Sequence, residues 1–208
     1  MTIRLIAFTD HARWPTSAEA LCRLCAEAAP LSVAVVLRDK NCSYRERLSW
    51  GLQLKQAALS TGQEFFVSDR IDLARSLSAD GVHLGADSVH PTQAKRLHPG
   101  PILRSGHGFS QLSATQKDRV DRLLVSPVCA PRKGREALGL VAFAAQVRGL
   151  KAEHPHLWIY ALGGVDASNA GACVEAGAEG VATMGAAMDE KSRDALLGAL
   201  GIRRTLVG

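Results

Sequence analysis

The sequence predicts an α/β protein that folds as a single-domain (β/α)8 TIM barrel over residues 1–208. Short apolar runs alternate with longer helical patterns, and this unit recurs eight times, as expected of parallel strands joined by helices. The chain is 47% hydrophobic over 208 residues, which is enough for one large core. No linker, low-complexity tract or shift in composition marks a second domain.

The elements can be taken in order along the chain. Each predicted strand is a short apolar run that ends at polar or small residues. The strands cover residues 4–8, 32–37, 64–67, 81–84, 102–104, 123–125, 157–162 and 180–183. A helical pattern follows each strand, and the predicted helices begin near Ser17, Tyr44, Ile71, Pro91, Gln111, Leu140, Ala167 and Glu190. The longest irregular segment, 126–139, follows the sixth strand and should overhang the active end of a barrel.

Composition narrows the class of protein. No apolar run approaches the roughly 18 residues of a membrane span and no signal peptide is evident, so we expect a cytoplasmic protein without a membrane partner. The five scattered cysteines favour reduced thiols. The net charge is +5, but the basic residues are dispersed and only 5% of residues are aromatic. An anionic small molecule is therefore expected rather than nucleic acid, with a solvated basic surface as the alternative. The sequence is also compatible with a homo-oligomer.

The last two predicted strands both end in turns of small residues. Gly163 and Gly164 follow the seventh strand, and Gly185 and Ala186 follow the eighth. Such turns leave backbone N–H groups uncovered at the start of a helix, where the helix dipole also favours an anion. Because the loops after strands seven and eight commonly hold a phosphate in these barrels, the four residues are predicted to bind a substrate phosphate.

Polar side chains follow the earlier strands at the same end of the barrel. Arg38 and Lys40 alternate after the second strand, so they point to one side and can hold a phosphate or carboxylate. The alternative for these cations is an ion pair with Asp69 or Asp87, which follow the third and fourth strands.

Two histidines lie among these strands. His83 is in the middle of the fourth strand, and we interpret it as a core histidine with satisfied hydrogen bonds. His107 follows the fifth strand between two glycines, where the chain can bend sharply and expose the ring. The unperturbed histidine pKa of about 6.5 suits proton transfer, and a merely solvated loop histidine is the alternative.

Six segments, in order and spacing, carry a resemblance to a known group of proteins. They are LRDK (37–40), SDRIDLA (68–74), ADGVHLG (79–85), RSGH (104–107), LGG (162–164) and AGAEGVA (176–182). Together they resemble the superfamily of thiamin phosphate synthase and its relative TenI, a thiazole tautomerase. The resemblance spans nearly the whole chain and implies a phosphorylated thiazole, or a related small molecule, as the ligand.

The resemblance to the synthase implies magnesium, which binds and neutralises the leaving pyrophosphate. Several of its motif positions are altered here. Val36 stands in place of a glutamine, Ser68 in place of an asparagine, and residues 85–88 read GADS where the synthase has Gly-Gln-Glu-Asp. A synthase would therefore hold magnesium through Asp69, with the second carboxylate lost unless Asp87 takes over.

TenI does not require these metal-binding residues. The resemblance to TenI implies a proton shift in a thiazole carboxylate phosphate, without a metal or other cofactor. Its Arg-Ser-Val-His stretch is similar to residues 104–107, which places His107 at the catalytic histidine. We therefore expect a TenI-like isomerase in which His107 moves the proton and Asp69 orients one of the substrate-binding cations. The substrate-binding residues in this expectation are Arg38, Lys40, Arg104 and Ser105.

Two alternatives stay open. One is a magnesium-dependent thiamin phosphate synthase, which joins hydroxymethylpyrimidine pyrophosphate to thiazole phosphate. The other is a barrel that has lost catalysis and binds a phosphorylated heterocycle.

Overall fold

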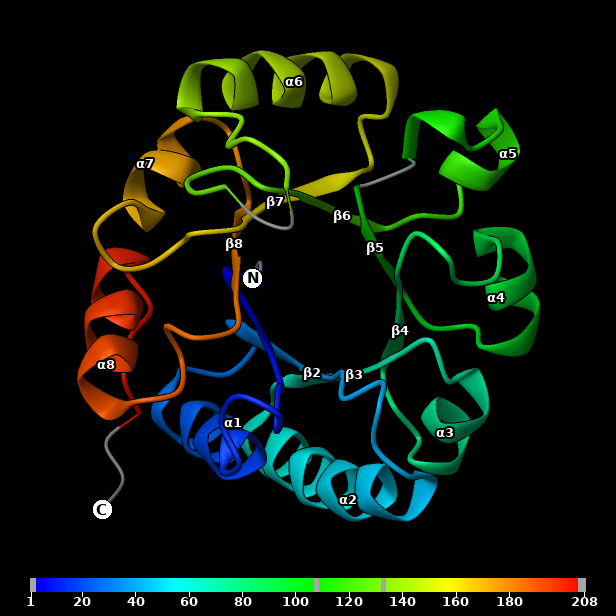
Figure 1. Cartoon of the computed structure of the whole chain (residues 1–208), viewed down its shortest axis with the longest axis vertical. Coiled ribbons are helices and arrows are strands. Elements are labelled where there is room, and N and C mark those ends of the chain that lie inside the picture. Colours follow the sequence, from blue (N-terminus) through cyan, green and yellow to red (C-terminus); the bar gives the residue numbers. More distant parts are fainter. Residues whose placement is uncertain (1–2, 107–108, 132–133, 206–208) are drawn as a thin grey trace.

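The computed structural model describes residues 3–106, 109–131 and 134–205, which form a closed barrel ringed by helices (Figure 1). Eight parallel strands in these residues pair in chain order, and the last pairs with the first. They are β1 (Leu5–Phe8), β2 (Val33–Leu37), β3 (Glu64–Ser68), β4 (Gly81–Leu84), β5 (Ile102–Ser105), β6 (Arg122–Val125), β7 (Trp158–Leu162) and β8 (Gly180–Thr183). The predicted (β/α)8 fold is confirmed.

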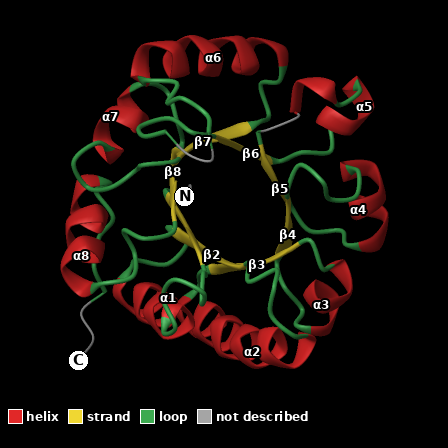
Figure 2. Cartoon of the chain, in the orientation of Figure 1, coloured by secondary structure: helices red, strands yellow, loops and turns green. Residues whose placement is uncertain are grey.

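The helices lie outside the strands, as Figure 2 shows. They are α1 (Ser17–Glu27), α2 (Tyr44–Thr61), α3 (Ile71–Ser76), α4 (Pro91–Leu97), α5 (Ala114–Lys117), α6 (Leu140–Glu153), α7 (Ala170–Glu175) and α8 (Glu190–Ala199). Predicted strand ends agree to within one residue, and six of these helices begin at the predicted residue.

Two predicted helix starts, near Gln111 and Ala167, are too early. A short 3-10 helix, Phe109–Gln111, precedes α5, whose start is fixed by a capping box between Ser113 and Gln116. Before α7, the Asp166 carboxylate accepts hydrogen bonds from the Ser168 N–H and hydroxyl. These side-chain bonds hold the segment before Ala170 as a turn.

Alternate residues of each strand belong to two different layers of the core. Ile6, Phe66 and Tyr160 pack inside the barrel, whereas their strand neighbours pack against the surrounding helices. Both faces of every strand are therefore buried, as parallel sheets covered by helices require. The same alternation decides which residues at a strand end face the mouth of the barrel.

The amino-terminal end of the barrel is filled by a buried ion pair. Arg122 forms a two-pronged pair with Glu64, and its guanidinium lies 5.3 Å from the ring centres of both Phe66 and Trp158. The Tyr160 hydroxyl donates to the Ile3 carbonyl at 3.0 Å. Trp158 therefore packs at the amino-terminal end of the barrel. A ligand can enter at the opposite end.

Within the described residues, none of the helices combines the length and the apolar character that crossing a membrane requires.

Candidate active site

The turn after β7 is shaped by two glycines. Gly163 and Gly164 have φ angles of +97° and +71°, and a Cβ atom on Gly164 would lie 2.4 Å from the Ala130 Cβ atom. Only glycine fits this backbone without strain. Within the described residues, the N–H groups of Gly163, Gly164 and Gly185 donate to no protein acceptor, whereas the Ala186 N–H donates to the Thr183 hydroxyl at 3.2 Å. The two turns therefore present free donors of the kind that bind a phosphate.

These turns open into a cavity of about 880 Å³ that all four predicted phosphate-binding residues line. Lys191 and Ser192, from the first turn of α8, lie at the same cavity. Trp14, from the loop after β1, forms another wall, and its ring lies 3.1 Å from the point where a Gly185 Cβ atom would be. The structure therefore places Trp14 beside the turn after β8.

A second cavity, of about 140 Å³, lies over the barrel mouth. Arg38, His83 and Ser105 line it together with Arg135 from the loop after β6. Leu162 and Met184 line both cavities, so the two share a wall. A ligand held by its phosphate at the glycine turns can therefore extend towards the cations of the smaller cavity.

His83 lies between two serine hydroxyls. Its Nδ1 atom is 2.6 Å from the Ser68 Oγ atom, and its Nε2 atom is 3.1 Å from the Ser105 Oγ atom. Burial, the largest effect, lowers the pKa of His83 to about 3, so the ring is neutral near pH 7. The interpretation of a satisfied core histidine is confirmed, yet the same ring also forms part of the smaller cavity.

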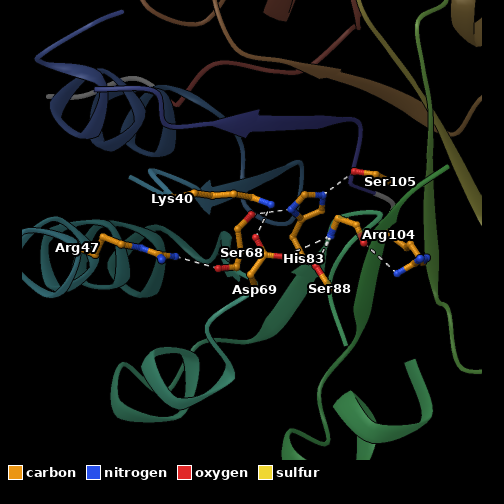
Figure 3. Close-up of polar contacts among 9 residues, drawn as sticks. Lys40, Arg47, Ser68, Asp69, His83, Ser88, Arg104 and Ser105 are labelled. Carbon is orange, nitrogen blue, oxygen red and sulfur yellow. Dashed lines mark hydrogen bonds and ion pairs between the residues drawn. The ribbon is translucent and has the colours of Figure 1, made fainter. Parts of the chain in front are cut away.

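Lys40, Asp69 and Ser88 form a polar cluster beside His83, as Figure 3 shows. The Lys40 Nζ atom lies 2.6 Å from the Asp69 Oδ2 atom, which is the ion pair that the sequence allows as an alternative. The Ser88 hydroxyl donates to the other carboxylate oxygen. Burial raises the pKa of Asp69, but the hydrogen bonds from Lys40 and Ser88 outweigh it and hold the pKa below its ordinary value.

Arg104 lies apart from both cavities. Its strand neighbour Leu103 packs inside the barrel, so the Arg104 side chain emerges on the helix side, where Nη1 donates to the Gly85 carbonyl at 3.1 Å. Asp87 is exposed in the loop after β4. His107 falls outside the described residues. The structure thus brings Arg38 and Ser105 to one cavity and places Lys40 with Asp69 beside it, without Arg104 or Asp87.

Comparison with known proteins identifies the family. Residues 5–187 match the family described as Thiamine monophosphate synthase. The chain belongs to the thiamine monophosphate synthase family. It is 40% identical over 159 residues to the Thiamine-phosphate synthase of Thermus thermophilus, covering 74% of each chain. It is 33% identical over 165 residues to that of Chloroflexus aurantiacus, covering 77% of this chain and 74% of the relative.

A solved structure agrees with this family assignment. The Thiamine phosphate pyrophosphorylase from Pyrococcus furiosus superposes with a TM-score of 0.79 at 26% identity, over 96% of both chains. Structural likeness therefore extends along almost the whole barrel.

The expectation of a TenI-like isomerase is wrong. The relatives at 33–40% identity are named thiamine-phosphate synthases, which indicates a transferase of thiamin biosynthesis rather than an isomerase. Arg104, the first residue of the motif that favoured TenI, lines neither cavity. It therefore says little about the chemistry of the site.

Three residues that line or support the candidate site were not predicted from the sequence. Arg47, buried on α2, donates to the Ser68 carbonyl at 2.8 Å and holds the end of β3 next to Asp69, whose φ is +61°. Ser88 and Arg135 lie in loops. The altered motif at residues 85–88 pointed to Ser88, whereas Arg47 gave no signal because it resembles any basic residue on a helix.

Proposed function

We propose that this chain is a thiamine-phosphate synthase, a transferase that joins a pyrimidine diphosphate to a thiazole phosphate and releases diphosphate. The observation that carries the proposal is the pair of adjoining anion sites, one at the glycine turns and one at Arg38 and Arg135. A reaction between two phosphorylated substrates needs two such sites side by side. The names of the relatives support the same activity.

The geometry suggests which group binds where. The free N–H groups after β7 and β8 would hold the thiazole phosphate, and Arg38, Lys40 and Arg135 would face the diphosphate. The neutral His83 ring keeps the Ser105 hydroxyl at the smaller cavity without adding a positive charge. Binding both substrates across the shared wall of Leu162 and Met184 would align them for reaction.

In the reaction, the bond between the pyrimidine-bearing carbon and the diphosphate oxygen breaks, and its electron pair leaves with the diphosphate. The thiazole nitrogen supplies the electron pair of the new bond to that carbon. Negative charge therefore grows on the leaving oxygen while Arg38 and Lys40 lie near it. Cations beside the leaving oxygen stabilise this charge and so lower the barrier.

The residues present do not fit the magnesium ion that the resemblance implies. Both oxygens of Asp69 already face protein donors, namely Lys40 and Ser88, and Asp87 is exposed elsewhere in the loop. Among the described residues, no group of three or more histidine, cysteine, aspartate or glutamate side chains could hold a metal ion. We therefore assign no step to a bound metal.

The proposal predicts that the purified chain, given both substrates, forms thiamin phosphate and one equivalent of diphosphate. Arg38→Ala should lower kcat/KM by about 10²–10³, because it removes a cation from the leaving group. Arg45→Ala, which removes an exposed arginine from α2, is the matched control and should leave the rate unchanged. Binding of thiazole phosphate without any product would contradict the proposal and leave a non-catalytic binder.

A further inference from the structure

Both oxygens of the Asp69 carboxylate already have protein partners. Oδ2 faces the Lys40 ammonium at 2.6 Å. Oδ1 accepts from the Ser88 hydroxyl and, at 3.4 Å, from the Gly85 N–H. A divalent cation that bound here would compete with Lys40 and Ser88 for the carboxylate oxygens. Displacing the ammonium would place two cations side by side, which is electrostatically unfavourable.

A second carboxylate is missing from this place. Ser88 occupies the position beside Asp69, and a neutral hydroxyl contributes far less to holding a hard cation than a carboxylate does. The neighbouring Asp87 side chain is exposed, and no contact joins it to Asp69 in the described part of the chain. One carboxylate that is already paired is a poor donor set for magnesium.

The surrounding charges favour an anion instead. Arg38 and Arg135 line the adjoining cavity, and Lys40 extends beside it, against the single negative charge of Asp69. These four groups sum to a net charge of about +2, which attracts a diphosphate and opposes a free divalent cation. Lys40 is suited to exchange partners, because nearly half of its side chain (46%) is exposed.

We propose that this chain binds no divalent cation of its own at Asp69, and that Lys40, Arg38 and Arg135 supply the positive charge that meets the diphosphate. Lys40 exchanges its contact with Asp69 for one with the diphosphate when the substrate binds. The role given to the diphosphate depends on the proposed synthase function, whereas the statement about metal binding does not.

The first test measures metal binding without substrates, with Mn²⁺ as the probe, in the purified chain. The wild type should show no site tighter than about 1 mM. Ser88→Asp restores a second carboxylate beside Asp69 and should tighten Mn²⁺ binding at least tenfold. Ser88→Asn is the neutral control and should not. In the Ser88→Asp background, Asp69→Asn should abolish the gain.

A tight Mn²⁺ site in the wild type that disappears in Asp69→Asn would overturn the proposal. Its loss in Asp87→Ala as well would assign the second ligand to Asp87. These wild-type, Asp69→Asn and Asp87→Ala measurements decide the matter even if Ser88→Asp does not fold.

The second test measures binding of inorganic diphosphate in excess chelator. Wild-type protein should bind it, and Lys40→Met should weaken binding at least tenfold, because a charge-assisted contact is lost. Lys55→Met removes an equal charge from α2, where Lys55 lies 3.5 Å from Asp80, and should leave binding unchanged. Diphosphate binding that requires added Mg²⁺ would overturn the proposal. Neither test involves turnover, so a failed synthase assay would leave both results interpretable.

Discussion

His83 shows how a single buried residue sets the electrostatics of the site. Held between Ser68 and Ser105, it remains neutral while Lys40 and Arg38 provide the positive charge nearby. A protonated ring at this position would repel those cations and would itself be buried. Its neutrality has a consequence for folding, because the unfolded chain binds a proton more readily than the folded chain does.

We predict that stability falls as the pH falls from about 6.5 towards 3, in part through His83. In this window the unfolded chain carries the proton and the folded chain does not. Lowering the pH from 7.5 to 5 should therefore cost the wild type about 2 kcal/mol through this residue. His83→Gln, which keeps a hydrogen-bonding side chain, should lose this part of the pH dependence. Urea unfolding at both pH values measures the free energy of unfolding of each protein. An equal loss of this free energy in both proteins between pH 7.5 and pH 5 would contradict the prediction.

The turn after β7 offers a prediction about an element. Gly164→Ala places a side chain at a φ of +71° and against Ala130, so we expect a loss of about 1–3 kcal/mol in the free energy of unfolding. Because the turn must shift, binding of inorganic phosphate should also weaken.

The control for this variant lies in α6. A Cβ atom on Gly149 would have no neighbour within 4 Å, so Gly149→Ala should stabilise the protein by roughly 0.5–1 kcal/mol. Chemical unfolding and phosphate titration of both variants provide the comparison. Similar effects of the two substitutions would show that the turn is not under constraint.

The elements were predictable because apolar runs and capping residues are local signals, but the orientation of the strand ends was not. Strands buried on both faces show no alternation of apolar and polar residues, so the sequence does not reveal which positions face inward. This is why Arg104 and Arg38 looked alike, although Arg104 donates to the Gly85 carbonyl and Arg38 lines the smaller cavity. The roles of Ser88 and Arg135 depend on loop positions that only the folded chain defines.

At the scale of the whole molecule, an ion pair joins the first and last helices next to the closure of β8 on β1. Arg193 of α8 makes two hydrogen bonds to the Glu27 carboxylate of α1, at 2.7 and 2.8 Å, and is only 3% exposed. Beyond α8, the chain pairs with the end of α1: Ala29 N–H donates to the Arg203 carbonyl at 2.8 Å. These contacts fasten the carboxyl-terminal segment to the start of the barrel.

Removing one partner of this pair should destabilise the whole barrel. Arg193→Met leaves the Glu27 carboxylate without its buried partner, and we expect a loss of about 3–5 kcal/mol. For a chain of this length that corresponds to a fall in Tm of roughly 6–20 °C. Adding Glu27→Leu should recover most of the loss, because no unpaired charge is then left behind.

The control is an exposed ion pair. Arg204→Met breaks the pair with Asp194 and should change stability by less than about 1 kcal/mol. Calorimetry of the four proteins tests this, and an Arg193→Met variant as stable as Arg204→Met would mean that the barrel does not depend on this closure.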